Sequence, residues 1–114
     1  MVQRFDVGAR ISEMAVLDNT IYLAGQIAKD DSQDIAGPTR QVLASIDALL
    51  ARAGSDKSKI LMAQIFLADL NDFAAMNAVW DAWVVPGQTP PRTTVLAGMI
   101  KPAWKVEIVV TAAR

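Results

Sequence analysis

The sequence predicts one α+β domain of residues 1–114, ordered β-β-β-α-β-α-β-β, with two helices on one face of a mixed sheet. At 114 residues and 53% hydrophobic content, the chain can build one compact core and has no room for a second. Short apolar or alternating runs, typical of strands, are interrupted by two segments in which apolar residues recur at helical spacing. Strands and helices mixed in this order favour helices packed against a sheet.

The chain begins with three predicted strands. Residues 1–7 form a short first strand, and residues 12–17 and 20–24 form a hairpin of apolar, β-favouring residues. Asp18 and Asn19 lie between the two hairpin strands. Both residue types tolerate left-handed backbone geometry, so a tight turn is expected there.

A helix of about fifteen residues is expected between Pro38 and Gly54, because proline suits a first helical turn and glycine a C-terminal stop. Its apolar residues recur at helical spacing: Val42, Leu43, Ile46, Leu49 and Leu50. Residues 60–70 are nearly continuously apolar, as in a strand that is covered on both faces.

A second helix is predicted to begin after Asp72, which is expected to cap it, and to end at Pro86 and Gly87. Its apolar face is formed by Phe73, Met76, Trp80 and Trp83. Aromatic stripes at this spacing are typical of a core, and we interpret this one as core.

Two final strands, 92–99 and 104–112, are predicted to form a hairpin joined near Lys101 and Pro102. Alternation places Arg92 and Thr94 on one face of the first strand, and Glu107 on one face of the second. A turn near residue 101 would bring Glu107 opposite Val95.

Two helices can cover only one face of such a sheet, yet several predicted strands are apolar on both faces. The residues expected to form an exposed patch are Val16, Ile65, Leu67, Val95 and Val109. Large exposed apolar patches usually mark association surfaces, so the sequence predicts a homo-oligomer packed sheet face to sheet face.

The composition excludes several classes of function. Eleven Lys and Arg against twelve Asp and Glu give a net charge of -1, which offers no surface for nucleic acid. The absence of Cys and His removes thiolate and imidazole chemistry and the common zinc motifs, so no metal site is expected. No apolar run approaches a membrane span or a signal peptide, and we expect a soluble cytoplasmic protein.

Arg92 is the most informative residue, because a lone guanidinium in an apolar strand needs an anionic partner. Pro90 and Pro91 hold the approach to it extended. Glu107, the carboxylate of the last strand, is a candidate acid or base. Two alternatives stay open: Arg92 and Glu107 form a structural ion pair, or a substrate lies between them, with Arg92 on its carboxylate and Glu107 at water.

Two further positions are candidates for binding. Asn77 carries an amide among apolar helix residues and needs hydrogen-bond partners, for which nearby backbone is the simplest source. Gly25, at the end of the early hairpin and followed by Gln26, offers backbone N–H groups to an anion.

Over nearly its full length the chain resembles the RidA/YjgF family, some of whose members carry the older label of L-PSP endoribonuclease. The resemblance is carried by the following segments, in order: GQI at 25–27, TRQVLASIDALLARAG, LADLNDF, FAAMNAVWDAW, PPRTTV and KVEIVV. The phrases NDFAAMNAVWDAWVV and KVEI look closest to a short bacterial branch of the family.

The resemblance implies a chorismate-mutase-like fold assembled as a homotrimer, with sites in the clefts between subunits. It implies hydrolysis of 2-imino or enamine acids, such as 2-aminoacrylate, to 2-oxo acids and ammonia, without metal or organic cofactor. By position, Arg92 would bind the substrate carboxylate, the Gly25 N–H would assist, the Thr94 carbonyl would meet the substrate nitrogen, and Glu107 would orient or activate water. Asn77 matches a supporting asparagine.

The chain departs from the family pattern at two positions. Ile11 stands where many deaminases have a tyrosine, and Ala24 where they have a serine. Both changes remove hydroxyls and make the expected pocket more apolar. A non-catalytic module that binds a small carboxylate such as a 2-oxo acid is therefore the alternative function. Ribonuclease activity, which the older label suggests, is disfavoured by the missing histidine and basic patch.

Overall fold

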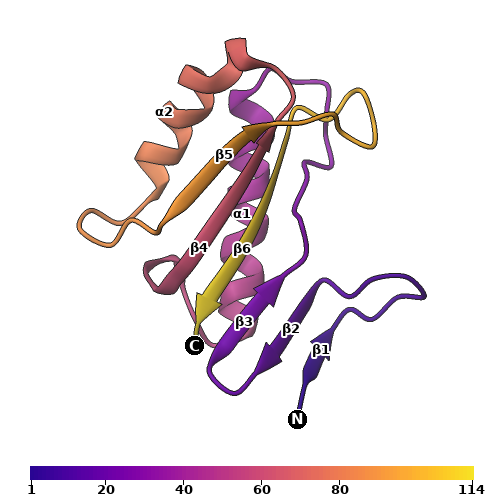
Figure 1. The fold of residues 1–114 in the computed structure, drawn as a ribbon, viewed down its shortest axis with the longest axis vertical. Coiled ribbons are helices and arrows are strands. Elements are labelled where there is room, and N and C mark those ends of the chain that lie inside the picture. The colour runs from indigo at the N-terminus through magenta and orange to yellow at the C-terminus, as the bar shows by residue number, and fades with distance from the viewer.

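The computed structural model describes all of residues 1–114, as one layer of six strands and one layer of two α-helices (Figure 1). The predicted α+β order β-β-β-α-β-α-β-β is confirmed. The strands are β1 (Gln3–Phe5), β2 (Met14–Leu17), β3 (Thr20–Leu23), β4 (Ile60–Leu67), β5 (Arg92–Leu96) and β6 (Val106–Ala113). The helices are α1 (Ala36–Arg52) and α2 (Phe73–Trp83). In space the strands follow the order β1-β2-β3-β6-β4-β5.

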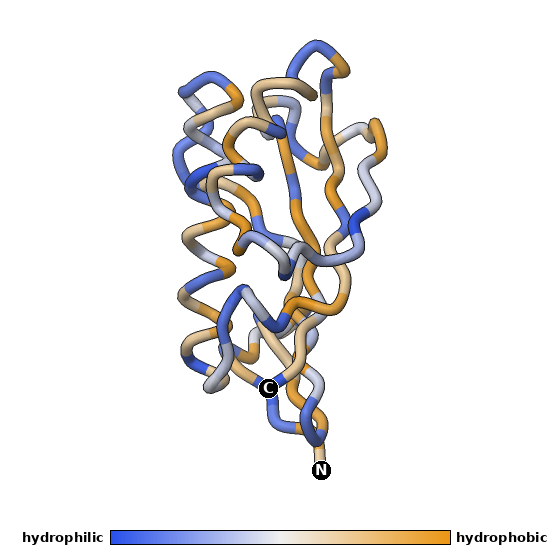
Figure 2. Tube along the Cα trace, turned by 90° about the vertical axis from the view of Figure 1, so that its left-hand side faces the viewer, coloured by the Kyte–Doolittle hydropathy of each residue, from blue (hydrophilic) through white to orange (hydrophobic).

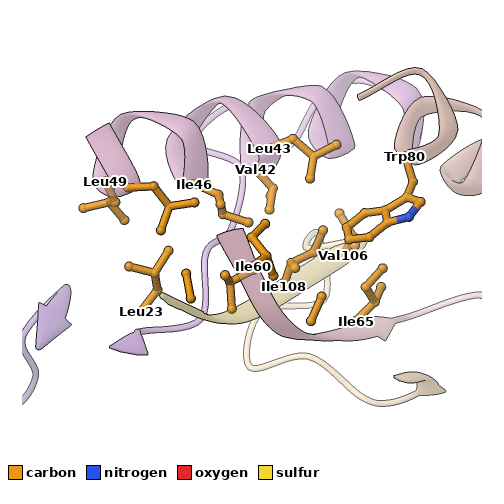
Figure 3. Packing of buried hydrophobic residues seen from close by; sticks show 14 of the residues in the cluster. Leu23, Val42, Leu43, Ile46, Leu49, Ile60, Ile65, Trp80, Val106 and Ile108 are labelled. Atoms are coloured by element: carbon orange, nitrogen blue, oxygen red, sulfur yellow. The ribbon is translucent and has the colours of Figure 1, made fainter. Parts of the chain in front are cut away.

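Both helices cover the same face of the sheet, as Figure 2 shows from the side. The strand β6 alternates strictly, with Val106, Ile108 and Val110 buried toward the helices. Figure 3 shows Val106 and Ile108 beneath Val42 of α1. Burying each such aliphatic side chain contributes about 1.5–3 kcal/mol, so this face of the sheet holds the domain together. Neither helix is long and apolar enough to cross a bilayer.

The turn predictions at the first hairpin and at the end of α1 are confirmed. Asp18 has a φ of 54°, the left-handed geometry expected of the turn between β2 and β3. Gly54 has a φ of 76°, and the Ser55 N–H donates to the Leu50 carbonyl at 2.9 Å, which closes α1. The helix is 17 residues long and begins two residues before Pro38.

The predicted capping of α2 by Asp72 is wrong. Asp72 has helical backbone angles and its side chain makes no capping hydrogen bond. A short 3₁₀ helix, Leu70–Asp72, runs directly into α2 and is capped instead by Asp69, whose carboxylate accepts from the Asn71 N–H at 2.9 Å. Because the chain is already helical at Asp72, that residue lacks the extended geometry of an N-cap.

The predicted C-terminal hairpin is also wrong. The strands β5 and β6 are not neighbours, because β4 lies between them, parallel to β5 and antiparallel to β6 (Figure 1). The sequence β4-α2-β5 is a strand-helix-strand crossover, which returns the chain parallel to the strand it left. The loop from residue 97 to 105 then carries the chain past β4 to the middle of the sheet.

The face of the sheet opposite the helices carries no other layer (Figure 2). Val16, Ile65 and Leu67, expected to be exposed there, instead point toward the helices and are buried. Val95 and Val109 do lie on the uncovered face, because their neighbours along each strand point toward the helices. We define the open-face patch as Tyr22, Met62, Phe66, Val95 and Val109.

Candidate functional site

Arg92 begins the edge strand β5 and faces the helices. Its register partner on β4 is Ala63, which is fully buried under the helices, and cross-strand partners share a face. The Arg92 guanidinium carbon lies over the ring of Trp80 in α2, 5.4 Å from the ring centroid. The one ion pair of the chain joins Arg52 to Asp6, so Arg92 has no carboxylate partner within the subunit.

Asn77 and Thr94 lie next to this contact. Asn77 precedes Trp80 by three positions on α2, and Thr94 follows Arg92 by two positions on β5, so each shares a face with its neighbour. The Asn77 Oδ1 and the Thr94 Oγ1 are both buried without a hydrogen-bond partner. Most buried polar atoms have a hydrogen-bond partner, so these two can accept hydrogen bonds from a group outside the subunit. We call Asn77, Trp80, Arg92 and Thr94 the arginine half.

The backbone carbonyl of Thr94 points away from the sheet. The Ala63 N–H donates to the Pro91 carbonyl, and the Ala97 N–H donates to the Leu67 carbonyl, each at 3.0 Å. Because alternate residues of a parallel strand bond to one neighbour, these bonds place the odd-numbered residues of β5 toward β4. The Thr94 carbonyl is therefore directed at the free edge, where it can accept a hydrogen bond from outside the subunit.

Glu107 lies on the other face of the sheet. It pairs with Phe66 of β4, and Val95 of β5 also pairs with Phe66, so Glu107 is level with Val95 but one strand further away. Arg92 and Glu107 thus share neither a strand pair nor a face. The structural ion pair between them is not formed.

Gly25 is the closest sequence-predicted residue to Glu107. A methyl group added at Gly25 would lie 2.9 Å from the Cδ of Glu107 and 3.1 Å from its Cγ. Reciprocal backbone hydrogen bonds between Gln26 and Ile108, at 2.9 and 3.1 Å, bring the two segments together. The Gly25 N–H makes no hydrogen bond within the chain and is free to donate to a ligand.

Ala24 directly precedes Gly25, whereas Ile11 belongs to the loop between β1 and β2. The Ala24 N–H donates to the Glu13 carbonyl at 2.9 Å, and Ile11 lies in the loop two residues before Glu13 with its side chain 60% exposed. We call Ile11, Ala24, Gly25 and Glu107 the glutamate half. The structure brings Glu107 beside Gly25 and, separately, Trp80 beside Arg92, and it does not bring the two halves together.

Two residues around the site, Gln26 and Trp80, are not among the predicted site residues. The Gln26 side chain is buried and its Nε2 donates to the Glu13 Oε2 at 3.0 Å and to the Ala24 carbonyl at 3.1 Å, which fixes the backbone beside Gly25. Trp80 was interpreted as core alone. An amide directly after the glycine was the available signal for Gln26, whereas nothing in the helical spacing distinguishes Trp80 from its core neighbours.

Two small pockets of the subunit are bordered by predicted site residues, and a larger pocket is not. Glu107 borders a pocket of about 140 Å³ together with the loop after β5, and Thr94 borders one of about 180 Å³ beside Phe73. The largest pocket, about 550 Å³, lies between α1 and α2, contains none of the predicted site residues and has mainly alanine walls. We place the candidate site at the two halves, because the arginine half holds the unpaired Arg92 and the glutamate half holds Glu107 beside the free Gly25 N–H.

No group of three or more acidic side chains is arranged to hold a metal ion. The carboxylates with shifted pKa values also lie outside both halves. The Arg52 hydrogen bond lowers the pKa of Asp6, and the hydroxyl groups of Ser32 and Ser58 lower the pKa of Asp30 and Asp56. These three carboxylates belong to surface turns and ion pairs and take no part in the candidate site.

Comparisons with known proteins agree on one family. The family model described as Endoribonuclease L-PSP matches residues 1–114. The RutC family protein YoaB of Escherichia coli K12 is 50% identical over 112 residues, which cover 98% of this chain and 97% of that protein. A RutC family protein of Haemophilus ducreyi is 48% identical over 113 residues, covering 99% and 97%.

Solved structures give the same result. NMB1025 of Neisseria meningitidis, a member of the YjgF protein family, is 42% identical with a TM-score of 0.97, over 100% of this chain and 95% of that one. A Salmonella typhimurium protein described as a translation initiation inhibitor is 45% identical with a TM-score of 0.91, covering 99% and 97%. The chain therefore belongs to the RidA/YjgF family, whose model is described as endoribonuclease L-PSP.

Proposed function

We propose that this protein is a deaminase that hydrolyses 2-imino and enamine acids to 2-oxo acids and ammonia, in a site completed by a second copy of the chain. The observation that carries the proposal is the division of the site. An unpaired guanidinium, held over Trp80, lies on the helix side of the sheet edge, while Glu107 and the free Gly25 N–H lie on the opposite face.

A second copy supplies the missing half without any change in the fold. The arginine half lies at the free edge of β5, and the glutamate half lies on the same side of the sheet as the open-face patch. Apolar patches of this kind favour association. A contact between two different surfaces, repeated from copy to copy, closes as a ring, and the proposed ring is a homotrimer with three sites.

The proposed chemistry needs positioning and modest proton transfer. Arg92 binds the substrate carboxylate through two N–H groups, with the Gly25 N–H as a further donor. Glu107 takes a proton from water as the water oxygen attacks the electrophilic carbon of the C=N bond. An enamine reacts as its imine tautomer, whose nitrogen is protonated, so the attack gives a neutral carbinolamine and Glu107 then returns its proton to the nitrogen. As the C–N bond breaks, the carbinolamine hydroxyl becomes the carbonyl and gives its proton to Glu107. Ammonia leaves with that proton as ammonium, together with the 2-oxo acid. The Thr94 carbonyl accepts a hydrogen bond from the substrate nitrogen.

The direct test is hydrolysis of 2-aminoacrylate generated enzymatically, with pyruvate and ammonia followed together. We expect the two products in equal amounts, a loss of about 10²–10⁴-fold in kcat for Glu107→Gln, and a large rise in KM for Arg92→Ala. Arg40→Ala is the matched control, since Arg40 is an exposed arginine on α1. No acceleration over buffer, or full activity in Arg92→Ala, would overturn the proposal.

One observation favours a second candidate, a non-catalytic module that binds small carboxylates in the same site. Ile11 and Ala24 give the glutamate half apolar side chains, so no hydroxyl there can help to orient water. Calorimetry with pyruvate and 2-oxobutyrate distinguishes the two functions. Tight binding that depends on Arg92, in a protein without imine turnover, would establish the binding module.

RNA cleavage is disfavoured for this chain, although the family model is described as Endoribonuclease L-PSP. With a net charge of -1, the protein lacks the excess of cations that binding a polyanion requires. It also has no histidine to transfer protons at phosphate. The site contains a single arginine, which suits one small carboxylate.

A further inference from the structure

The buried Trp80 ring packs against the Arg92 guanidinium. Its indole is 5% exposed and belongs to the hydrophobic core, where Figure 3 shows it beside Val106 and Ile65. The Arg92 guanidinium carbon lies 5.4 Å from the centroid of this ring. A long arginine side chain loses considerable rotamer freedom when it is held in one place, and a fixed aromatic surface offsets that cost.

The Trp80 ring is itself held from a second side. Trp83 packs against it with centroids 5.4 Å apart and a tilt of 48°, and the Trp83 Nε1 donates to the Asp47 Oδ2 of α1 at 2.9 Å. Lys57 lies over the outer face of this pair, 5.2 Å from the Trp83 centroid. A continuous series of contacts therefore runs from α1 through the two tryptophans to Arg92.

The contact leaves the donors of Arg92 available. A guanidinium carries five N–H groups at its edges, and an aromatic ring beneath it competes for none of them. A carboxylate partner in the same place would occupy two of these donors and neutralise the charge, and the chain supplies no such partner. Trp80 thus fixes the guanidinium without consuming its capacity to bind an anion.

From these contacts we infer that Trp80 is the positioning residue of Arg92, and that it sets the affinity of the site for the carboxylate of its ligand. The inference rests on the proposed function in assigning the carboxylate to Arg92. It goes beyond that function in naming the group that determines how tightly the carboxylate is held. Trp83 contributes indirectly, by holding Trp80.

The test compares Trp80→Leu, Trp80→Phe and Met76→Leu. Met76 is a fully buried residue of the same helix, and its substitution probes core packing without removing the ring under Arg92. We expect Trp80→Leu to raise KM for 2-aminoacrylate, and Kd for pyruvate, by roughly three- to tenfold with kcat little changed. Trp80→Phe keeps an aromatic face and should restore most of the affinity, and Met76→Leu should keep wild-type KM.

A readout without ligand separates positioning from general damage to the fold. In the wild type the Trp80 ring current should shift the NMR signal of the Arg92 Nε–H upfield, and Trp80→Leu should abolish this shift while Met76→Leu retains it. An unchanged KM and Kd in Trp80→Leu, or an equal rise in Met76→Leu, would overturn the inference.

The outcomes also distinguish this inference from the proposed function. If the wild type binds pyruvate with a Trp80-dependent Kd but does not hydrolyse 2-aminoacrylate, the deaminase is wrong and the role of Trp80 stands. If turnover occurs and Trp80→Leu is kinetically silent, the deaminase stands and the role of Trp80 is wrong. A wild type that neither binds nor turns over overturns both.

Discussion

Gly25 shows at the scale of a single residue how the backbone can set the place of a side chain. Gly25 has no side chain, so the Glu107 side chain can lie against the backbone there. The Gly25 N–H beside it has no hydrogen-bond partner within the chain. Glu107 could be singled out from the sequence because it is the one carboxylate in an apolar strand. Its closeness to Gly25 could not, because that depends on the Gln26–Ile108 bridge between segments more than 80 positions apart.

The variant Gly25→Ala tests this packing. The added methyl would displace the flexible end of Glu107 and leave the backbone in place, because Gly25 does not have a positive φ. We expect a fall in kcat of about 10–100-fold, since a catalytic group misplaced by about 1 Å can cost this much, with an unchanged melting temperature. Gly98 borders the same pocket as Glu107, but a methyl added there would touch nothing, so Gly98→Ala is the control. Wild-type kcat in Gly25→Ala would show that the position of the carboxylate is unimportant.

At the scale of elements, the strands and helices follow from the sequence and the neighbours of the last two strands do not. The alternation of residues 106–113 and the helical spacing around Ile46 give the element types directly, because burial on one face sets the period. The alternation of buried and exposed residues along a strand does not indicate which other strand is its neighbour in the sheet. The strand-helix-strand order 60–96 was the signal for a parallel pair, and this pairing places β4 between the strands of Arg92 and Glu107.

A second feature at this scale is the link between the first strand and α1. Arg52, in the last turn of α1, donates to both carboxylate oxygens of Asp6, at 2.7 and 3.1 Å, and lies over the Phe5 ring. The Arg52 hydrogen bond lowers the pKa of Asp6 in the folded protein. The stabilisation is therefore present above the ordinary carboxyl pKa of about 3.9 and is lost as pH falls through the lowered value.

We expect Asp6→Asn to lower the melting temperature slightly at about pH 7 and to equal the wild type once the pH falls below the lowered pKa of Asp6, where the wild-type carboxylate is protonated. Asparagine also tolerates the positive φ of this position, so the substitution isolates the charge. Asp18→Asn is the matched control, because Asp18 also has a positive φ but forms no ion pair. A gap between Asp6→Asn and wild type that persists at low pH would contradict this account.

At the scale of the whole molecule, the proposed function makes the single subunit an incomplete site. The sequence predicted an uncovered apolar face, because two helices can cover only one face of the sheet. Three of the five residues assigned to that face, Val16, Ile65 and Leu67, are instead buried under the helices. Alternation already places Glu107 on the face of Val95, opposite Arg92, but it could not predict that β4 lies between their two strands. The association proposed above is therefore a condition for function and not only for stability.

The most direct test of this claim is complementation between Arg92→Ala and Glu107→Gln. At a 2-aminoacrylate concentration near the wild-type KM, each variant alone should have little activity, because every site lacks one group. Unfolding the two together and refolding them as a mixture should restore about one quarter of wild-type activity, since about one site in four then joins an intact arginine half to an intact glutamate half. A mixture as inactive as its components, while refolded wild type regains activity, would contradict a site shared between two copies.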